Sequence, residues 1–346
     1  STPKEETVAV PVRSAPLSTP SVSRRSLCAG ALLTLGLPIW AQASYPARPI
    51  VLVVPQAAGG TNDIVGRIVA QKLGEKLSVG TVVENRPGAG GNIGTQAVAK
   101  AARDGHTLLM TISSSQAINP ALYKSPGFDP VGDFTPVSMI GAVPNVLLAH
   151  PSFPARTVPE LLALARSKPG ELQYASAGNG TLNHLLGEML NQMAGVQLQH
   201  VPYKGVAPAL NDVLGGQLPL LFGSLPSTLQ YIKSGKLRAL AVSSAARSPL
   251  LPDVPSLGEF VPGYNGTLWI ALFAPRGLPP AVMSRLREGM QQAMADKDMR
   301  AQLQAQGVEL AGTPERQITP DELAAVLKQD IAKWAQIVKT SGATVN

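Results

Sequence analysis

The hydrophobic positions change period repeatedly along the chain, and this predicts strands alternating with helices. Residues 49–54 form a short continuous apolar run, which is typical of a strand covered on both faces. Residues 61–77 then place Ile64, Ile68 and Leu73 on one helical stripe. Strands and helices in this order predict a parallel α/β sheet.

The same rhythm continues through most of the sequence. Further strands are expected at residues 81–84, 106–112, 172–175, 198–201, 218–222, 237–242 and 269–273. Further helices are expected at residues 92–102, 158–167, 181–193, 207–214, 280–306 and 320–340. The apolar run of residues 143–150 separates two series of alternating strands and helices. We therefore expect two lobes of similar architecture, although no sequence repeat is evident.

Residues 1–43 have the features of an export leader. Arg24 and Arg25 precede an apolar stretch that is too short to span a bilayer comfortably, and an Ala-Gln-Ala sequence follows it. We expect cleavage after Ala43 and a periplasmic mature protein. The paired arginines resemble a twin-arginine signal with departures at later positions, so Sec and twin-arginine export both stay open.

Composition and charge narrow the function classes. Hydrophobic residues make up 45% and charged residues 15% of the 346 residues, which fits a globular chain. The net charge of +7 invites a nucleic-acid interpretation, but no run of Lys or Arg follows Arg25, and aromatic residues are only 4%. We therefore expect no nucleic-acid partner, and a mildly basic chain suits an anionic ligand better.

The usual signals of catalysis and cofactor binding are weak. Cys28 is the only cysteine, and cleavage after Ala43 would remove it, leaving no thiol for a disulfide, a nucleophile or a metal site. His184 and Glu188 lie one helical turn apart but lack a third ligand. The glycines after Arg86 depart from the dinucleotide fingerprint. We expect no cofactor, no metal and no enzymatic activity.

Two glycine-rich loops each join a strand to a helix. We call residues 54–63 the first loop and residues 174–184 the second loop. Their small side chains would let a ligand reach the N–H groups of the helix start, where the dipole also favours an anion. Either loop alone can be an ordinary connection, with Thr61 as a cap in the first. Because one loop falls in each expected lobe, the pair favours a shared anion site.

Many ordered segments resemble one known family. The matching segments are Gly59-Gly60-Thr61-Asn62-Asp63, Val83-Glu84-Asn85-Arg86-Pro87-Gly88-Ala89-Gly90-Gly91-Asn92-Ile93-Gly94, Asp104-Gly105-His106-Thr107-Leu108-Leu109, Val201-Pro202-Tyr203-Lys204-Gly205, Leu214-Gly215-Gly216-Gln217 and Pro252-Asp253-Val254-Pro255. The resemblance extends over nearly all of residues 45–346. The chain therefore resembles the Bug, or tripartite tricarboxylate transporter, solute-binding proteins.

The resemblance implies a fold class and boundaries. It implies an α/β fold of the periplasmic-binding-protein kind, with two lobes in the type II, or Venus flytrap, arrangement. Residues 44–142 with 268–346 would form lobe 1, and residues 143–267 would form lobe 2. Residues 1–43 would be the signal peptide and leader.

The resemblance also implies a ligand site formed by both loops. Its expected residues are Gln56, Ala57, Ala58, Gly59, Thr61, Asp63, Ser114, Ser176, Gly178, Thr181, Tyr203 and Ser224. Many relatives have an aromatic residue near Gln56 or Ala57 and an acid near Gly223, and this chain has neither. The missing acid disfavours an amino-acid ligand, so we expect a di- or tricarboxylate or an aromatic acid.

The implied partners are the membrane permease subunits of a tripartite tricarboxylate transporter, served by a monomeric receptor. Two alternatives stay open at this point. The protein could present its ligand to a membrane sensor kinase, since both roles use the same liganded shape. An exported hydrolase of small esters would instead need a Ser within hydrogen-bond reach of a His in the cleft.

Overall fold

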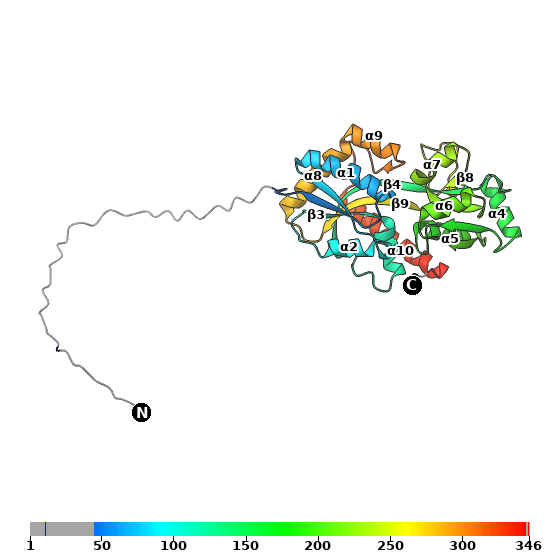
Figure 1. Cartoon of the computed structure of the whole chain (residues 1–346), viewed down its shortest axis with the longest axis horizontal. Helices are drawn as coiled ribbons and strands as arrows, with labels where there is room; N and C mark the ends of the chain where they lie inside the picture. Colours follow the sequence, from blue (N-terminus) through cyan, green and yellow to red (C-terminus); the bar gives the residue numbers. More distant parts are fainter. Residues whose placement is uncertain (1–10, 12–44, 344, 346) are drawn as a thin grey trace, which may run out of the picture. The chain divides into compact units, whose positions relative to one another are not determined.

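The computed structural model describes residue 11, residues 45–343 and residue 345, and the fold is that of the compact unit Ala43–Asn346. The expected cleavage site and the signal in residues 1–43 lie outside the described residues, apart from Pro11. Figure 1 shows the helices arranged around one long sheet.

The strands form a single ten-stranded sheet in the order β2-β1-β3-β9-β4-β7-β5-β6, with β8 and β10 also paired to β4. The strands are β1 (Ile50–Val54), β2 (Thr81–Asn85), β3 (Thr107–Ile112), β4 (Phe134–Ala149), β5 (Gln173–Ser176), β6 (Gln199–Pro202), β7 (Leu220–Ser224), β8 (Arg238–Val242), β9 (Thr267–Pro275) and β10 (Glu309–Leu310).

The α-helices pack on the faces of this sheet. They are α1 (Thr61–Leu77), α2 (Asn92–Ala99), α3 (Asn119–Leu122), α4 (Val158–Ser167), α5 (Leu182–Ala194), α6 (Val206–Leu214), α7 (Leu225–Lys233), α8 (Pro280–Ala295), α9 (Lys297–Ala305) and α10 (Pro320–Ser341). Short helical turns occur at η1 (Ala89–Gly91), η2 (Ser114–Ile118) and η3 (Leu257–Glu259).

The sheet has two parallel parts joined by antiparallel strands. Strand β1 runs parallel to β2 and β3, and β5 runs parallel to β6 and β7. Between them, β9 pairs antiparallel with β3 and β4, and β4 pairs antiparallel with β7. We call the part with β1–β3 lobe 1 and the part with β5–β8 lobe 2. The expected parallel sheet is thus correct for β1–β3 and for β5–β7. It is wrong for β4 and β9, which join the lobes, and for β8, which pairs antiparallel with β4.

Several expected elements differ from the observed ones. The joining strand β4 begins at Phe134, well before the expected apolar run, and α7 was not expected at all. The helix expected over residues 280–306 is broken at Asp296, which has extended backbone angles and accepts the amides of Asp298 and Met299 at 3.1 Å as the cap of α9. The break arises because an N-cap carboxylate starts a new helix there.

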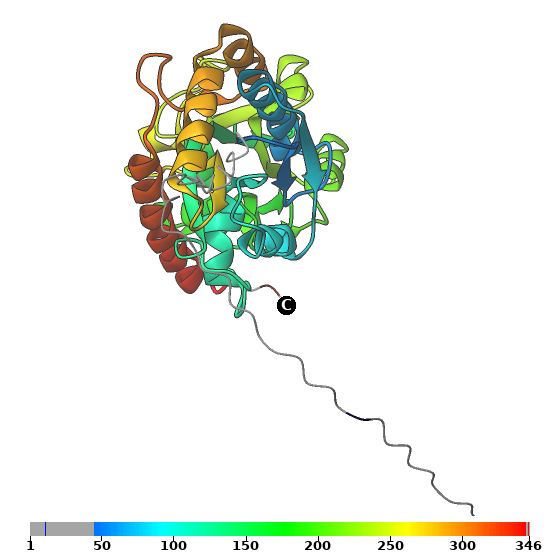
Figure 2. The ribbon, with the colours of Figure 1, turned by 90° about the vertical axis from the view of Figure 1, so that its left-hand side faces the viewer.

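The C-terminal helix contacts both lobes. Helix α10 contacts α3 and η2 in lobe 1 and α5 in lobe 2, and Figure 2 shows it in red, separate from α8 in orange. Its Trp334 is fully buried in the apolar core. The fold is therefore an α/β periplasmic-binding-protein fold with two lobes. The residue boundaries between the lobes, at 142/143 and 267/268, stay a prediction.

Candidate functional site

A cleft of about 620 Å³ lies between the two lobes. Helices α1, α5, α6 and α7 all begin at this cleft. Its lining residues are Gln56, Gly59, Gly60, Thr61, Asn62, Ile64, Gly90, Ile112, Ser114, Asn145, Thr181, Leu182, Asn183, Val206, Ala207, Leu210, Ser224, Pro226, Ser227, Leu268 and Gln306. None of these described lining residues carries a charged side chain.

Asp63 holds the first loop in its observed conformation. The Gly59 amide donates to Asp63 Oδ2 at 2.8 Å, and Gly59 has a φ of 79°, which suits glycine. Burial would raise the pKa of Asp63, but hydrogen bonds from Gly59, Arg67 and Asn85 outweigh it and lower that pKa. Asp63 is buried and does not line the cleft. Its carboxylate therefore stabilises the loop without contacting the cleft.

The start of α1 supplies further backbone donors in lobe 1. Gly60 is its N-cap and provides no side chain to cap the helix. Ile64 is the first residue whose amide has an intrahelical acceptor, the Gly60 carbonyl at 3.0 Å. The amides of Thr61, Asn62 and Asp63 therefore have no intrahelical partner, and two of these residues line the cleft.

The second loop is fixed in a similar way in lobe 2. The Gly178 amide donates to Ser176 Oγ at 3.0 Å, and the Gly180 amide donates to His184 Nδ1 at 3.0 Å. Thr181 caps α5 by accepting the His184 amide. The amides of Leu182 and Asn183 are left without an intrahelical acceptor, and both residues line the cleft.

An asparagine at the second position of α1 and of α5 holds each helix start to the sheet. Asn62 Nδ2 donates to the Met110 carbonyl of β3 at 2.9 Å, and Asn183 Nδ2 donates to the Phe222 carbonyl of β7 at 2.8 Å. Asn62 also donates to Gln56 Oε1, as Asn183 does to Asn145 Oδ1 at 2.9 Å. The two lobes thus present equivalent helix starts to one cleft.

Six of the twelve expected site residues line the cleft: Gln56, Gly59, Thr61, Ser114, Thr181 and Ser224. The other six, Ala57, Ala58, Asp63, Ser176, Gly178 and Tyr203, are not among its lining residues. Tyr203 instead donates its hydroxyl to Asp212 Oδ2 at 2.5 Å within lobe 2, and burial together with Asp212 raises the pKa of Tyr203 to about 12. The amides of Gly59 and Gly178, expected to hold an anion, already have partners in their own loops.

Sequence reasoning missed the apolar half of the cleft. Ile112 and Leu268 line it from β3 and β9, and Val206 and Leu210 line it from α6. It also missed Asn145 in the joining strand. The only signal that these residues line a cleft was their position at or near the ends of predicted strands and helices. Apolar residues at such positions can equally well belong to the hydrophobic core.

The Ser–His pair that a hydrolase would need occurs, but in a buried place. Ser176 Oγ lies 2.6 Å from His200 Nε2, Ser176 is fully buried, and its hydroxyl also accepts the Gly178 amide. Neither Ser176 nor His200 lines the cleft. The pair supports the second loop and is not placed to attack a ligand.

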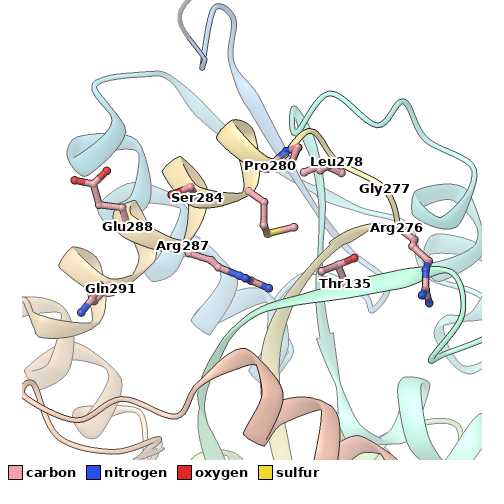
Figure 3. Close-up of a pocket in the computed structure, with 10 residues that line it drawn as sticks. Thr135, Arg276, Gly277, Leu278, Pro280, Ser284, Arg287, Glu288 and Gln291 are labelled. Carbon is pink, nitrogen blue, oxygen red and sulfur yellow. The ribbon is translucent and has the colours of Figure 1, made fainter.

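Other features of the described residues add no competing site. No group of three or more metal-binding side chains occurs among them, and His184 Nε2 is 3.8 Å from Glu188 Oε1. None of their helices has the length and apolar character to cross a bilayer. A second cavity of about 700 Å³ lies beside α8, where Arg287 extends toward Thr135 (Figure 3). Its Arg287 donates to the Pro136 carbonyl, and neither glycine-rich loop reaches it.

Two lobes that each contribute helix starts to one cleft are typical of a solute-binding receptor. The sequence profile described as "Tripartite tricarboxylate transporter family receptor" matches residues 65–343. The chain is 38% identical to Protein BugT of Bordetella pertussis over 302 residues, which are 87% of this chain and 91% of that protein. The chain therefore belongs to the tripartite tricarboxylate transporter receptor family, as the sequence predicted.

Solved structures agree with this assignment. R. palustris Rpa4515 with adipate matches with a TM-score of 0.76 and 35% identity, covering 87% of this chain and 99% of that chain. MatC from Rhodopseudomonas palustris with bound malate matches with a TM-score of 0.74 and 32% identity, covering 85% of this chain and 100% of that chain. Both relatives were thus solved with a carboxylate.

Proposed function

We propose that this protein captures a small organic carboxylate outside the cytoplasm and delivers it to the membrane subunits of a tripartite tricarboxylate-type transporter. The observation that carries the proposal is that α1 from lobe 1 and α5 from lobe 2 both begin at one cleft, where Thr61 and Leu182 of their first turns are lining residues. An anion between two helix starts gains hydrogen bonds and two favourable dipoles. The adipate and malate of the relatives support the same ligand chemistry.

A thermal-shift screen of the mature protein against several dozen carboxylates tests the capture step. A ligand present at about 100 times its Kd should add about 2.7 kcal/mol to the free energy of unfolding. Calorimetry on each hit then gives the stoichiometry, which should be one. If no aliphatic, aromatic or amino acid raises the melting temperature, the result would count against a carboxylate receptor.

The delivery step needs a separate test. Membrane vesicles that contain the cognate large and small transporter subunits should take up the ligand only when the liganded receptor is added. A matched control uses the Thr61→Pro receptor, which lacks a cleft amide. If instead the liganded receptor stimulates a membrane kinase and no uptake occurs, the protein serves sensing rather than transport.

A further inference from the structure

We propose that Asn145 determines ligand specificity, because its side-chain amide donates to an oxygen acceptor on the ligand and disfavours an ammonium group at the same position. The inference rests on the proposed carboxylate-binding function and adds a binding residue to it. It admits mono- and dicarboxylates alike, since a hydroxyl, carbonyl or carboxylate oxygen can accept this hydrogen bond. Three features of Asn145 carry it: its fixed backbone, the fixed orientation of its amide, and a donor left without a partner.

The first feature is that the backbone of Asn145 is held in place within the joining strand β4. Its N–H donates to Ser243 Oγ at 2.9 Å, and its carbonyl accepts the Ser243 amide at 2.8 Å. In the sheet Asn145 lies opposite Ser224 of β7, and both of these residues line the cleft. Only 2% of Asn145 is exposed. Its side chain therefore reaches the cleft from a fixed point of the sheet rather than from a loop.

The second feature is that hydrogen bonds fix which end of the Asn145 amide faces Asn183. Asn183 Nδ2 donates to the Phe222 carbonyl at 2.8 Å, and a carbonyl can only accept. The same Nδ2 donates to Asn145 at 2.9 Å, so Asn145 must present its Oδ1 there. The Nδ2 of Asn145 lies on the other branch of its amide and is left for a different partner.

The third feature is that Asn145 Nδ2 has no hydrogen-bond partner among the residues that the structure describes. This nitrogen is not one of their fully enclosed polar atoms, so it keeps contact with accessible space, and the space that Asn145 lines is the cleft. A donor that a bound ligand covers without offering an acceptor costs free energy. An oxygen of the ligand accepts this hydrogen bond, whereas an ammonium can only donate.

The neighbouring polar groups do not make this distinction. Asn183 Oδ1 can accept equally from a hydroxyl and from an ammonium, and the hydroxyls of Ser224 and Ser227 can turn to donate or to accept. The lining, as described, contains no charged side chain that would pair with an ammonium. The Asn145 amide is therefore the lining group that separates an oxygen substituent from an ammonium.

Two matched ligand pairs test the inference by calorimetry. Malate is compared with aspartate, and 6-hydroxyhexanoate is compared with 6-aminohexanoate. Within each pair the carbon skeleton is the same and a hydroxyl takes the place of an ammonium, beside a carboxylate in the first pair and at the far end in the second. We expect the hydroxy acid to bind about tenfold or more tightly in at least one pair. Equal or weaker binding of the hydroxy acid in both pairs would overturn the inference.

Two variants assign this preference to Asn145. Asn145→Asp keeps the shape and an oxygen for Asn183 Nδ2 but replaces the donor with a carboxylate oxygen, so the preference for the hydroxy acid should fall about tenfold or more. Asn145→Ala removes the donor without adding a charge, and the preference should fall by roughly five- to tenfold. An unchanged preference in whichever variants melt normally would overturn the assignment.

The matched structural control is Ser243→Ala. It removes the hydroxyl that accepts the Asn145 backbone amide and leaves the Asn145 side chain in place. This variant should melt at a lower temperature and keep the preference for the hydroxy acid. If it loses the preference as fully as Asn145→Ala does, the effect comes from disturbance of β4 and the assignment to the side-chain amide is wrong.

The outcomes also distinguish this inference from the proposed function. If other carboxylates bind but the pairs show no preference that depends on Asn145, the protein remains a carboxylate receptor and only the role of Asn145 is wrong. If no acid of either pair binds and the broader carboxylate screen also finds none, the proposed function fails and the inference falls with it.

Discussion

The imidazole rings of His184 and His200 stack in lobe 2 with their centroids 3.8 Å apart and their planes 14° from parallel. Both rings support the second loop. His184 Nδ1 accepts the Gly180 amide, and His200 Nε2 contacts Ser176 Oγ, which accepts the Gly178 amide. A protonated Nδ1 cannot accept a hydrogen bond, so the loop as observed needs a neutral His184.

The first prediction is that acidification destabilises lobe 2 through this pair. Burial lowers the pKa of His184 from 6.5 to about 4, and burial together with the neighbouring His184 lowers that of His200 from 6.5 to about 3. Between the unfolded pKa of 6.5 and the lowered folded pKa values, the unfolded chain binds more protons than the folded chain. The free energy of unfolding should therefore fall as the pH falls below about 6.5. Urea unfolding at pH 7.5, 6, 5 and 4.5 measures it.

The control for this prediction is a double variant, His184→Asn with His200→Gln. An Asn Oδ1 can still accept the Gly180 amide, and neither new side chain titrates. Glu188, whose pKa is raised by burial, and Tyr174 face the same cluster and remain in the variant. Its stability should therefore depend less steeply on pH than that of the natural chain. Parallel pH profiles would show that the histidines contribute nothing.

The second prediction concerns Lys204, a basic residue between β6 and α6. It is exposed and is not among the cleft-lining residues. Lys204→Ala should therefore weaken carboxylate binding by less than about tenfold, or about 1.4 kcal/mol. Calorimetry at low salt maximises any long-range contribution of its charge. A loss of a hundredfold or more would require a salt-bridged site in place of helix starts.

The third prediction is that ligand binding brings the lobes together. Each lobe supplies one helix start, and neither start alone surrounds a carboxylate. The lobes are linked through the long strands β4 and β9, and hinge closure around a ligand is common in such receptors. Solution scattering with saturating ligand should give a smaller radius of gyration than the free protein at the same concentration. An equal radius would mean that the ligand binds without closure.

Much of the fold could be predicted because most elements lie where local signals are strong. Helix α1 begins and ends as its apolar stripe predicts, and α4 matches its predicted bounds. Strand β4 could not be predicted in full, since Pro136, Gly141 and Pro144 interrupt its pattern and its pairing with β9 fixes it through distant contacts. Helix α7 starts at Leu225-Pro226 directly after a strand, which reads equally well as a turn.

The candidate site was predicted at the level of loops but not of atoms. The sequence pointed to both glycine-rich loops, and residues of both line the cleft. It could not show that the Gly59 amide is bonded to Asp63, because that bond depends on the three-dimensional path of the loop. Nor could it show that Asn183 and Asn145 meet, since they come from separate elements.

The last prediction isolates a single amide donor at the start of α1. Thr61 is the first residue of the helix, where a proline is tolerated because this N–H has no intrahelical partner. The preceding Gly60 has φ −78° and ψ 166°, which are compatible with a following proline. Thr61→Pro should therefore fold normally and remove one amide from the cleft.

The matched control is Thr61→Val, which removes the hydroxyl but keeps the amide and the branched shape. A hydrogen bond to a charged group contributes about 1.5–3 kcal/mol, so Thr61→Pro should bind carboxylate about tenfold or more weakly than Thr61→Val. Calorimetry gives the two affinities, and thermal melting checks that both variants are folded. Equal affinities in two folded variants would mean that the Thr61 amide does not hold the anion. The carboxylate site would then have to be reassigned to the side chains of the cleft, beginning with Thr181 and Ser114.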